Sequence, residues 1–163
     1  MNDVATRPQS ASEPFVVSLV RTVIAWLERI PYCLLALIAR VAPAAVFWRS
    51  GQTKVNGFAL ADSTIPLFQY EYKLPLIDPT IAAYASAIAE HVFPVLLVIG
   101  LASRFAAFAL FVMTMVIKVF VFPDAWPTHG TWIACFLLIM ARGPGMLSLD
   151  HLIARHYGLA KGC

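Results

Sequence analysis

Residues 79–100 read PTIAAYASAIAEHVFPVLLVIG, and the only acidic or basic side chains in this stretch are Glu90 and His91. A helix of this length rises slightly more than the roughly 30 Å of a bilayer's hydrocarbon core. Its first half is rich in alanine and serine, and such small residues let helix backbones approach one another closely. The stretch therefore predicts a transmembrane helix whose first half faces other helices.

Three more stretches have the same apolar character and a length of about 18–20 residues. They are residues 31–48 with an extension to Ser50, residues 104–122, and residues 130–149, the last interrupted by a Gly-Pro-Gly sequence at 143–145. The whole chain of 163 residues is 60% hydrophobic and 13% charged, against about 45–50% and about 25% in soluble domains. A globule of this size cannot bury so much apolar surface. We therefore expect an all-α integral membrane protein built as a four-helix bundle.

The flanking segments complete the predicted organisation. Residues 1–12 are polar and predict a disordered tail, and Ser12 is a suitable N-cap for the next segment. Residues 13–30 predict an amphipathic helix in the membrane interface, because apolar side chains recur at helical spacing and Arg21, Glu28 and Arg29 lie on the other face. Residues 31–149 form the four-helix transmembrane domain. Residues 150–163 predict a short C-terminal surface helix, capped by Ser148, and a tail.

Two charged residues lie deep within the predicted spans, Arg40 in the first and Glu90 in the second. A charge at the bilayer centre is costly, so it usually faces the bundle interior and has a partner. Counting residues from the start of each antiparallel span places both near mid-depth, and we expect them to form a pair. The pair is either a site for a proton, an ion or a quinone, or a structural ion pair that fixes the helix register.

A second group of polar residues maps to the side of the bundle that carries residues 49–78. Lys54, Glu71, Lys118 and His129 are predicted there and form a candidate polar mouth over the bundle. The alternative is a solvated interface with extended lysine side chains. We expect no metal site, because neither His91 nor His129 has a second ligand at helical spacing. We also find no local motif of a self-sufficient enzyme, so no catalytic residue is assigned.

Several pieces of the sequence together resemble the DoxX family of small bacterial four-helix membrane proteins. The resemblance covers about residues 35–150. The pieces are Arg40 followed by FWRSGQTK at 47–54, Glu90 in a small-residue helix that ends at Gly100, Arg104 at the next helix start, and the closing RGPG at 142–145 with SLD at 148–150. The resemblance implies a multi-pass protein of the bacterial inner membrane. It also implies redox partners, because the related DoxD subunit belongs to a thiosulfate:quinone oxidoreductase.

Three functions remain open at this point. The first is a membrane subunit or anchor of a redox complex, in which a quinone contacts Arg40 and Glu90. The second is a small ion-coupled transporter that uses the same two residues. The third is a structural assembly factor. No cofactor other than a quinone suggests itself. The expected partners are the lipid bilayer and other membrane or redox proteins, and a homo-oligomer fits as well. Nucleic acid is not expected, because the 12 Lys and Arg residues form no basic run.

The distribution of basic residues predicts that both termini lie in the cytoplasm, because basic residues are enriched in cytoplasmic loops. The tails and the turn near Arg104 carry Arg7, Arg21, Arg29, Arg104, Arg142, Arg155 and Lys161, and the other side carries Arg49, Lys54, Lys73 and Lys118. Single-cysteine labelling in intact cells should reach a cysteine at Thr64 from outside and one at Ala102 only from inside. The reverse pattern would contradict the orientation and leave the four spans intact.

Overall fold

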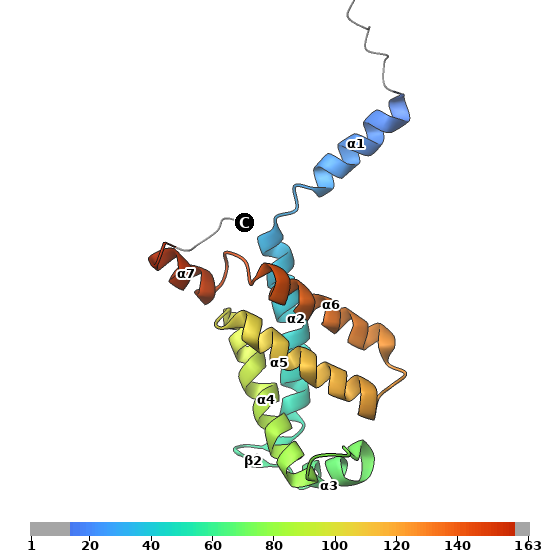
Figure 1. Cartoon of the computed structure of the whole chain (residues 1–163), viewed down its shortest axis with the longest axis vertical. Coiled ribbons are helices and arrows are strands. Elements are labelled where there is room, and N and C mark those ends of the chain that lie inside the picture. The colour runs from blue at the N-terminus through green and yellow to red at the C-terminus, as the bar shows by residue number, and fades with distance from the viewer. Residues whose placement is uncertain (1–13, 159–163) are drawn as a thin grey trace, which may run out of the picture. The chain divides into compact units, whose positions relative to one another are not determined.

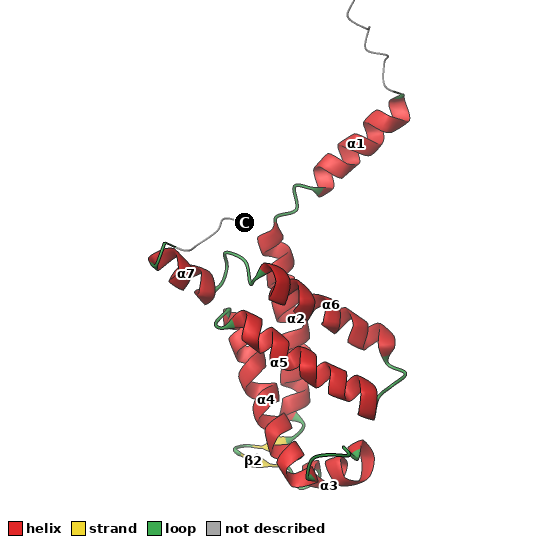
Figure 2. Ribbon diagram, viewed as in Figure 1, coloured by secondary structure: helices red, strands yellow, loops and turns green. Residues whose placement is uncertain are grey.

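The computed structural model describes residues 14–158, and the chain divides into two compact units between Pro31 and Tyr32. The predicted tail at 1–12, the Ser12 cap and residues 159–163 lie outside the described part. Helices dominate, and the strands are a single pair of two-residue segments within the described residues (Figure 2). The chain is an all-α membrane protein, as the sequence predicts.

Helix α1, Phe15–Leu27, is the described helix of the first unit. It begins after Pro14, and all of its side chains are exposed. Its 13 residues rise about 20 Å, which is less than the roughly 30 Å of a bilayer core. The helix is therefore too short to cross a membrane, and its place in the interface stays a prediction.

Helices α2, Tyr32–Gln52, and α4, Pro79–Ile99, are antiparallel neighbours in the second unit (Figure 1). Many of their buried side chains are alanines, which permit close backbone contact. Helix α4 starts sharply because the Asp78 carboxylate accepts hydrogen bonds from the backbone N–H groups of Thr80 and Ile81, at 2.9 and 3.2 Å. It ends at Gly100, whose φ of 75° is the left-handed conformation that glycine adopts readily.

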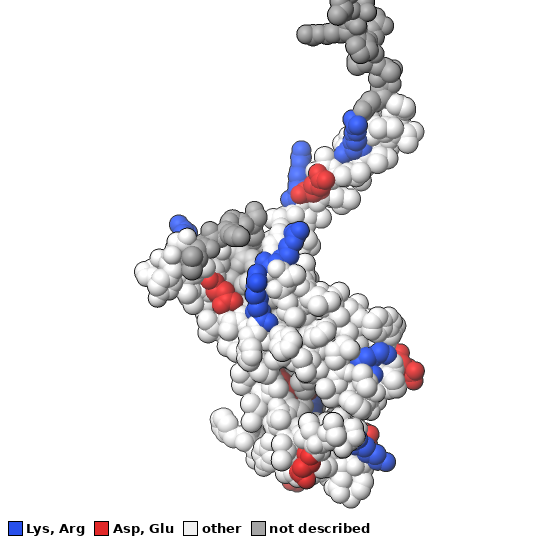
Figure 3. Space-filling model, viewed as in Figure 1, with Lys and Arg blue, Asp and Glu red and all other residues white. Residues whose placement is uncertain are grey.

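Helices α5, Ser103–Val116, and α6, Trp126–Arg142, complete a bundle of four helices with α2 and α4. The π-helical segment η2, Ile117–Val121, continues α5. The core between the four helices contains Phe47, Leu97, Leu110, Phe136 and Ile139. Side chains on the outside are largely apolar, and Figure 3 shows the charged residues of this unit mainly toward its ends. A lipid environment suits such a surface.

Among residues 14–158, three helices are long and apolar enough to cross a membrane: Tyr32–Gln52, Pro79–Ile99 and Ser103–Val121. The fourth predicted span, residues 130–149, is shifted in the structure. Helix α6 starts four residues earlier, at Trp126, and stops at Arg142, where Gly143 has a φ of 88°. Its 17 residues rise about 25 Å, so α6 packs as the fourth member of the bundle although it is shorter than the other three.

The segment between α2 and α4 folds back over one end of the bundle, which we call the loop end. It contains the hairpin β1, Val55–Asn56, and β2, Ala59–Leu60, then α3, Thr64–Pro66, and the π-helical segment η1, Leu67–Tyr72. Phe68 of η1 packs with Ala82 and Ala83 of α4. Thr64 is only 2% exposed, so the outer labelling probe belongs at the exposed Asp62 instead.

At the opposite end, helix α7, Leu149–His156, attaches to the turn between α4 and α5. The Ser148 hydroxyl accepts a hydrogen bond from the backbone N–H of His151, which confirms the predicted cap. The Asp150 carboxylate accepts from the backbone N–H groups of Ala102 and Ser103, at 2.7 and 2.8 Å. These bonds hold Ala102 at a φ of 48°, a conformation that an alanine rarely adopts. We call this end the α7 end.

Replacing two glycines in turn distinguishes the stability cost of a strained backbone conformation from the additional cost of steric crowding. Both Gly100 and Gly57 have positive φ angles, 75° and 62°. A Cβ at Gly100 would collide with Arg40 and Ser148, whereas a Cβ at Gly57 meets nothing within 4 Å. We expect Gly57→Ala to cost about 1–2 kcal/mol from conformation alone and Gly100→Ala about 2–5 kcal/mol. Thermal unfolding of both variants in one detergent measures the difference, and equal losses would contradict the crowding at Gly100.

Candidate functional site

A cavity of about 470 Å³ lies in the bundle toward the loop end. Its walls come from α2, α4, α5, η2 and α6, and η1 also contributes. Both π-helical segments border it, and such segments are rare and frequent at functional sites. Most of the lining is apolar. The residues on its wall with a charge, a hydroxyl or an imidazole are Ser50, Lys54, Tyr72, Ser86, Glu90 and His129.

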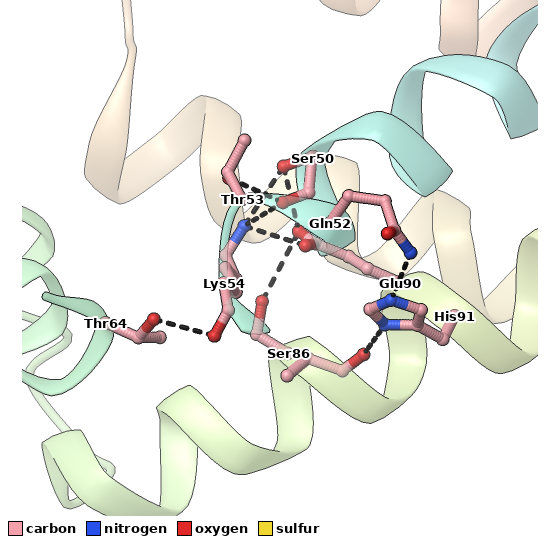
Figure 4. A network of polar contacts seen from close by, with 9 residues as sticks. Ser50, Gln52, Thr53, Lys54, Thr64, Ser86, Glu90 and His91 are labelled. Carbon is pink, nitrogen blue, oxygen red and sulfur yellow. Dashed lines mark hydrogen bonds and ion pairs between the residues drawn. The ribbon is translucent and has the colours of Figure 1, made fainter. Parts of the chain in front are cut away.

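A buried ion pair forms part of this wall. The Lys54 ammonium lies 2.7 Å from a carboxylate oxygen of Glu90, and the two residues are 4% and 2% exposed (Figure 4). Burying two charges is costly unless they pair closely and find further hydrogen bonds. The short distance shows that each is the principal partner of the other.

Two serines complete the hydrogen bonding of the pair. The hydroxyls of Ser50 and Ser86 donate to Oε1 of Glu90, at 3.3 and 3.4 Å, while Oε2 accepts from Lys54. The ammonium also donates to the Ser50 hydroxyl at 3.0 Å and reaches the Ser50 carbonyl at 3.5 Å. Both carboxylate oxygens and the three ammonium hydrogens therefore have protein partners. The network is complete without a ligand.

The close contact of α2 with α4 positions the pair. A Cβ at Gly51 would lie 2.9 Å from the His91 ring and 3.0 Å from Cβ of Glu90, so only glycine fits there without displacement. Because α2 ends at Gln52, the chain turns at this point and carries Lys54 onto Glu90. The Thr64 hydroxyl donates to the Lys54 carbonyl at 2.8 Å and holds this turn in place.

His91, the neighbour of Glu90, lies outside the cavity wall. Its Nδ1 lies 2.7 Å from the Ala87 carbonyl and its Nε2 lies 2.9 Å from the side-chain amide of Gln52 (Figure 4). A carbonyl only accepts, so Nδ1 donates and Nε2 accepts from the amide. The Trp48 ring packs edge-on against the imidazole, with centroids 5.0 Å apart. His91 thus links α4 to the last turn of α2.

The predicted pair of Arg40 and Glu90 is wrong. Arg40 is fully buried, but it lies at the α7 end, where its guanidinium donates to the Leu147 carbonyl and packs against Gly100. The prediction assumed that α2 and α4 start and end at the same depths. Instead, Gly51 lies beside Glu90, so the register differs by about ten residues, or about 15 Å along the helices. Glu90 meets Lys54 in consequence.

The structure divides the predicted polar mouth. Lys54 and His129 are buried and line the cavity, whereas Glu71 is exposed and is not on the cavity wall. Lys118 donates to the Pro123 carbonyl, and its ammonium lies 5.6 Å from the centre of the Trp126 ring. The four residues therefore share the loop end of the bundle, but two of them belong to the cavity and two do not.

Sequence reasoning missed Ser50, Ser86 and Tyr72. Helical spacing offered a signal for two of these, because Ser86 lies four residues before Glu90 and Ser50 four residues before Lys54. No comparable signal marks Tyr72, which reaches the cavity from η1. Burial raises the pKa of the Tyr72 phenol, and the nearby carboxylates of Glu90 and Glu71 raise it further. The phenol therefore stays protonated at neutral pH and can act as a hydrogen-bond donor.

With the fold and the cavity described, comparison with known proteins identifies the family. The DoxX family matches residues 35–123, more than half of the chain, and the chain belongs to this family. The matched range includes all but the first three residues of α2, the whole of α4 and α5 and the ion pair, and it ends before α6. The chain is also 29% identical over 132 residues to an uncharacterized protein from Haemophilus influenzae, covering 74% of this chain and 84% of that one. No solved structure matches the chain.

Removing one member of the ion pair should destabilise the protein far more than removing both. Glu90→Gln strands the Lys54 ammonium and Lys54→Met strands the carboxylate, and each should cost about 3–5 kcal/mol. The double variant with Lys54→Met and Glu90→Leu should recover most of this loss, because neither charge of the pair is left without its partner. Unfolding in a fixed detergent measures all three.

The matched control for this series is Lys73→Met. Lys73 is exposed at the loop end, so its replacement should change the stability by less than about 0.5 kcal/mol. A double variant as unstable as the single ones would show that the pair does not act as a coupled unit.

Proposed function

We propose that this protein is the membrane subunit of a redox complex and that its cavity binds a molecule of the quinone class. A quinone ring is neutral and apolar, and it carries carbonyl oxygens that accept hydrogen bonds. The protein would hold the quinone, and a partner protein would exchange electrons with it.

The observation that carries the proposal is the composition of the cavity wall. The volume of the cavity, about 470 Å³, falls within the roughly 300–1,000 Å³ that is usual for small-molecule sites. Most of the wall is apolar, with a few polar groups of the kind that orient a ligand. A buried ion pair inside a membrane bundle is costly, and such residues generally mark pathways for substrates or protons.

The chemistry of a quinone makes use of these groups. Reduction to the quinol takes up two electrons and two protons, so a quinone site needs a source of protons. The two protons come from solvent, and Lys54, Glu90, Ser50 and Ser86 form a hydrogen-bonded chain at the wall along which protons can pass. The electrons come from the partner protein, in line with the redox partners that the family resemblance implies.

We further propose that the protein lies in the bacterial inner membrane with both termini in the cytoplasm. The α7 end carries the exposed arginines Arg104, Arg142 and Arg155, which supports a cytoplasmic location for this end. The cavity and the ion pair lie toward the opposite end. A quinone would then enter from the outer half of the bilayer.

Fluorescence quenching of Trp132 tests quinone binding, because this tryptophan lines the cavity. Decylubiquinone or menadione added to the purified protein in detergent should quench its fluorescence in a saturable manner. Trp132→Phe should abolish the saturable part. Trp48→Phe is the matched control and should keep it, because Trp48 packs on His91 outside the cavity wall. Saturable quenching that survives in Trp132→Phe would place the quinone elsewhere, and its absence from the native protein would contradict the proposal.

Purification from native membranes tests the subunit role. The tagged protein should retain a partner that carries a flavin, haem or iron–sulfur centre, recognised by its visible absorption. Proteoliposomes that contain the protein alone should show no proton flux. Proton flux in the absence of quinone would instead support the small ion-coupled transporter.

A further inference from the structure

His129 differs from every other polar residue on the cavity wall. It lies in the first turn of α6 and is only 3% exposed, although it borders the cavity. Its ring packs against Trp132, with centroids 5.3 Å apart. Within residues 14–158, the Nδ1 of this buried imidazole has no hydrogen-bond partner. Buried polar groups nearly always have hydrogen-bond partners, so an unpaired one needs an explanation, and a bound group is the one that an adjoining cavity allows.

The other groups on the wall do not share this deficit. The Lys54 ammonium and the Glu90 carboxylate are satisfied by each other and by the two serines. Tyr72 is only half-buried, so water can reach its surroundings. His91, which lies outside this cavity wall, differs from His129 because protein groups are partners of both of its ring nitrogens. On the cavity wall, the buried atom without a hydrogen-bond partner is therefore Nδ1 of His129.

The Nδ1 of His129 is itself a buried atom, so it meets a ligand only after the imidazole ring rotates. Hydrogen bonds normally fix the orientation of a histidine ring, and no bond to Nδ1 does so here. A half-turn about the bond between Cβ and Cγ exchanges Nδ1 with a ring carbon. A neutral imidazole carries one donor and one acceptor nitrogen, so it can donate to a carbonyl oxygen or accept from a hydroxyl.

The charges near the cavity restrict the ligand further. Lys54 and Glu90 carry opposite charges in direct contact, so together they leave the wall without net charge. An anionic ligand would compete with Glu90 for the Lys54 ammonium and would strand the carboxylate. A neutral ligand leaves the pair intact.

We infer that His129 anchors the ligand in the cavity by a hydrogen bond to an oxygen of a neutral, mainly apolar molecule, and that the ion pair is not the anchor. This inference rests on the proposed quinone site and names the residue that recognises the carbonyl or hydroxyl group. It assigns His129 a binding role and Lys54 and Glu90 the neighbouring protonatable pair.

Two ring systems that differ only in their oxygens provide the test. Menadione is 2-methyl-1,4-naphthoquinone, and 2-methylnaphthalene has the same fused carbon skeleton without the two carbonyl oxygens. Equilibrium dialysis of each against the full-length protein in detergent gives the two dissociation constants. His129→Phe should weaken menadione binding by roughly tenfold or more and leave 2-methylnaphthalene binding unchanged. His129→Asn, which keeps a hydrogen-bonding group, should restore much of the menadione affinity.

His91→Phe is the matched control, and its effects on ligand binding and on melting temperature should be the opposite of those of His129→Phe. It removes an imidazole with two protein partners outside the cavity wall, so it should lower the melting temperature and leave menadione binding unchanged. His129→Phe removes an unsatisfied polar atom, so it should keep or raise the melting temperature. If His129 had a merely structural role, His129→Phe would instead lower the melting temperature and weaken the binding of both ligands alike.

The possible failures are distinguishable. Native protein that binds menadione with the same affinity as His129→Phe would overturn the anchoring role and leave the quinone site standing. Native protein that binds no quinone would overturn the proposed function together with the inference. If His129→Phe does not fold, His129→Leu, which also lacks a hydrogen-bonding group, takes its place, and equal binding of menadione by this variant and the native protein, or equal weakening of both ring systems, would contradict a hydrogen bond to the oxygens.

Discussion

The contact of α2 with α4 at Gly51 sets the register of the bundle, and the rest of the structure follows from that register. With Gly51 against Glu90 and His91, α2 ends beside the middle of α4. The chain then turns within the bundle and brings Lys54 to Glu90. The first half of α4 packs instead against the segment between Val55 and Tyr72. This segment covers the loop end and closes one side of the cavity. A side chain larger than hydrogen at position 51 would separate the two helices where the ion pair needs them closest.

Composition and span lengths predict the architecture well, because a membrane core imposes its thickness on any helix that crosses it. The same reasoning fails for the partners of charged residues. The depth of a charged residue in the membrane is predicted from its distance to the helix ends. The axial offset between α2 and α4 depends instead on one contact between them, which residue counting does not predict. Glu90 is buried and paired, as its place in a span predicts, but its partner is Lys54, which the sequence places in the polar mouth because it follows the end of a span. Arg40 was correctly predicted to be buried, and its acceptor is a backbone carbonyl at Leu147, which has no sequence signal.

The cavity shows two ways in which this membrane bundle treats buried polar groups. Around Glu90 the protein supplies each hydrogen bond itself, from residues one helical turn apart and from a neighbouring loop. At His129, which borders the same cavity, it leaves a buried ring nitrogen without a hydrogen-bond partner. The first arrangement makes an ion pair tolerable in a low-dielectric interior. The second arrangement costs free energy as long as the nitrogen has no partner, and a ligand would supply one. The two parts of the wall therefore have different roles in the proposed site.

The attachment of Asp150 to the start of α5 bears on the order in which the chain is completed during synthesis. The backbone N–H groups of Ala102 and Ser103 take their acceptor from Asp150, which is 48 and 47 positions later, and Arg40 donates to the carbonyl of Leu147, which is 107 positions away. While the ribosome has not yet delivered these last residues, the first turn of α5 is uncapped and the Arg40 guanidinium lacks its acceptor. The bundle therefore becomes complete only when the C-terminal segment arrives, and a nascent chain that ends before residue 147 would expose both defects to quality-control proteases in the membrane.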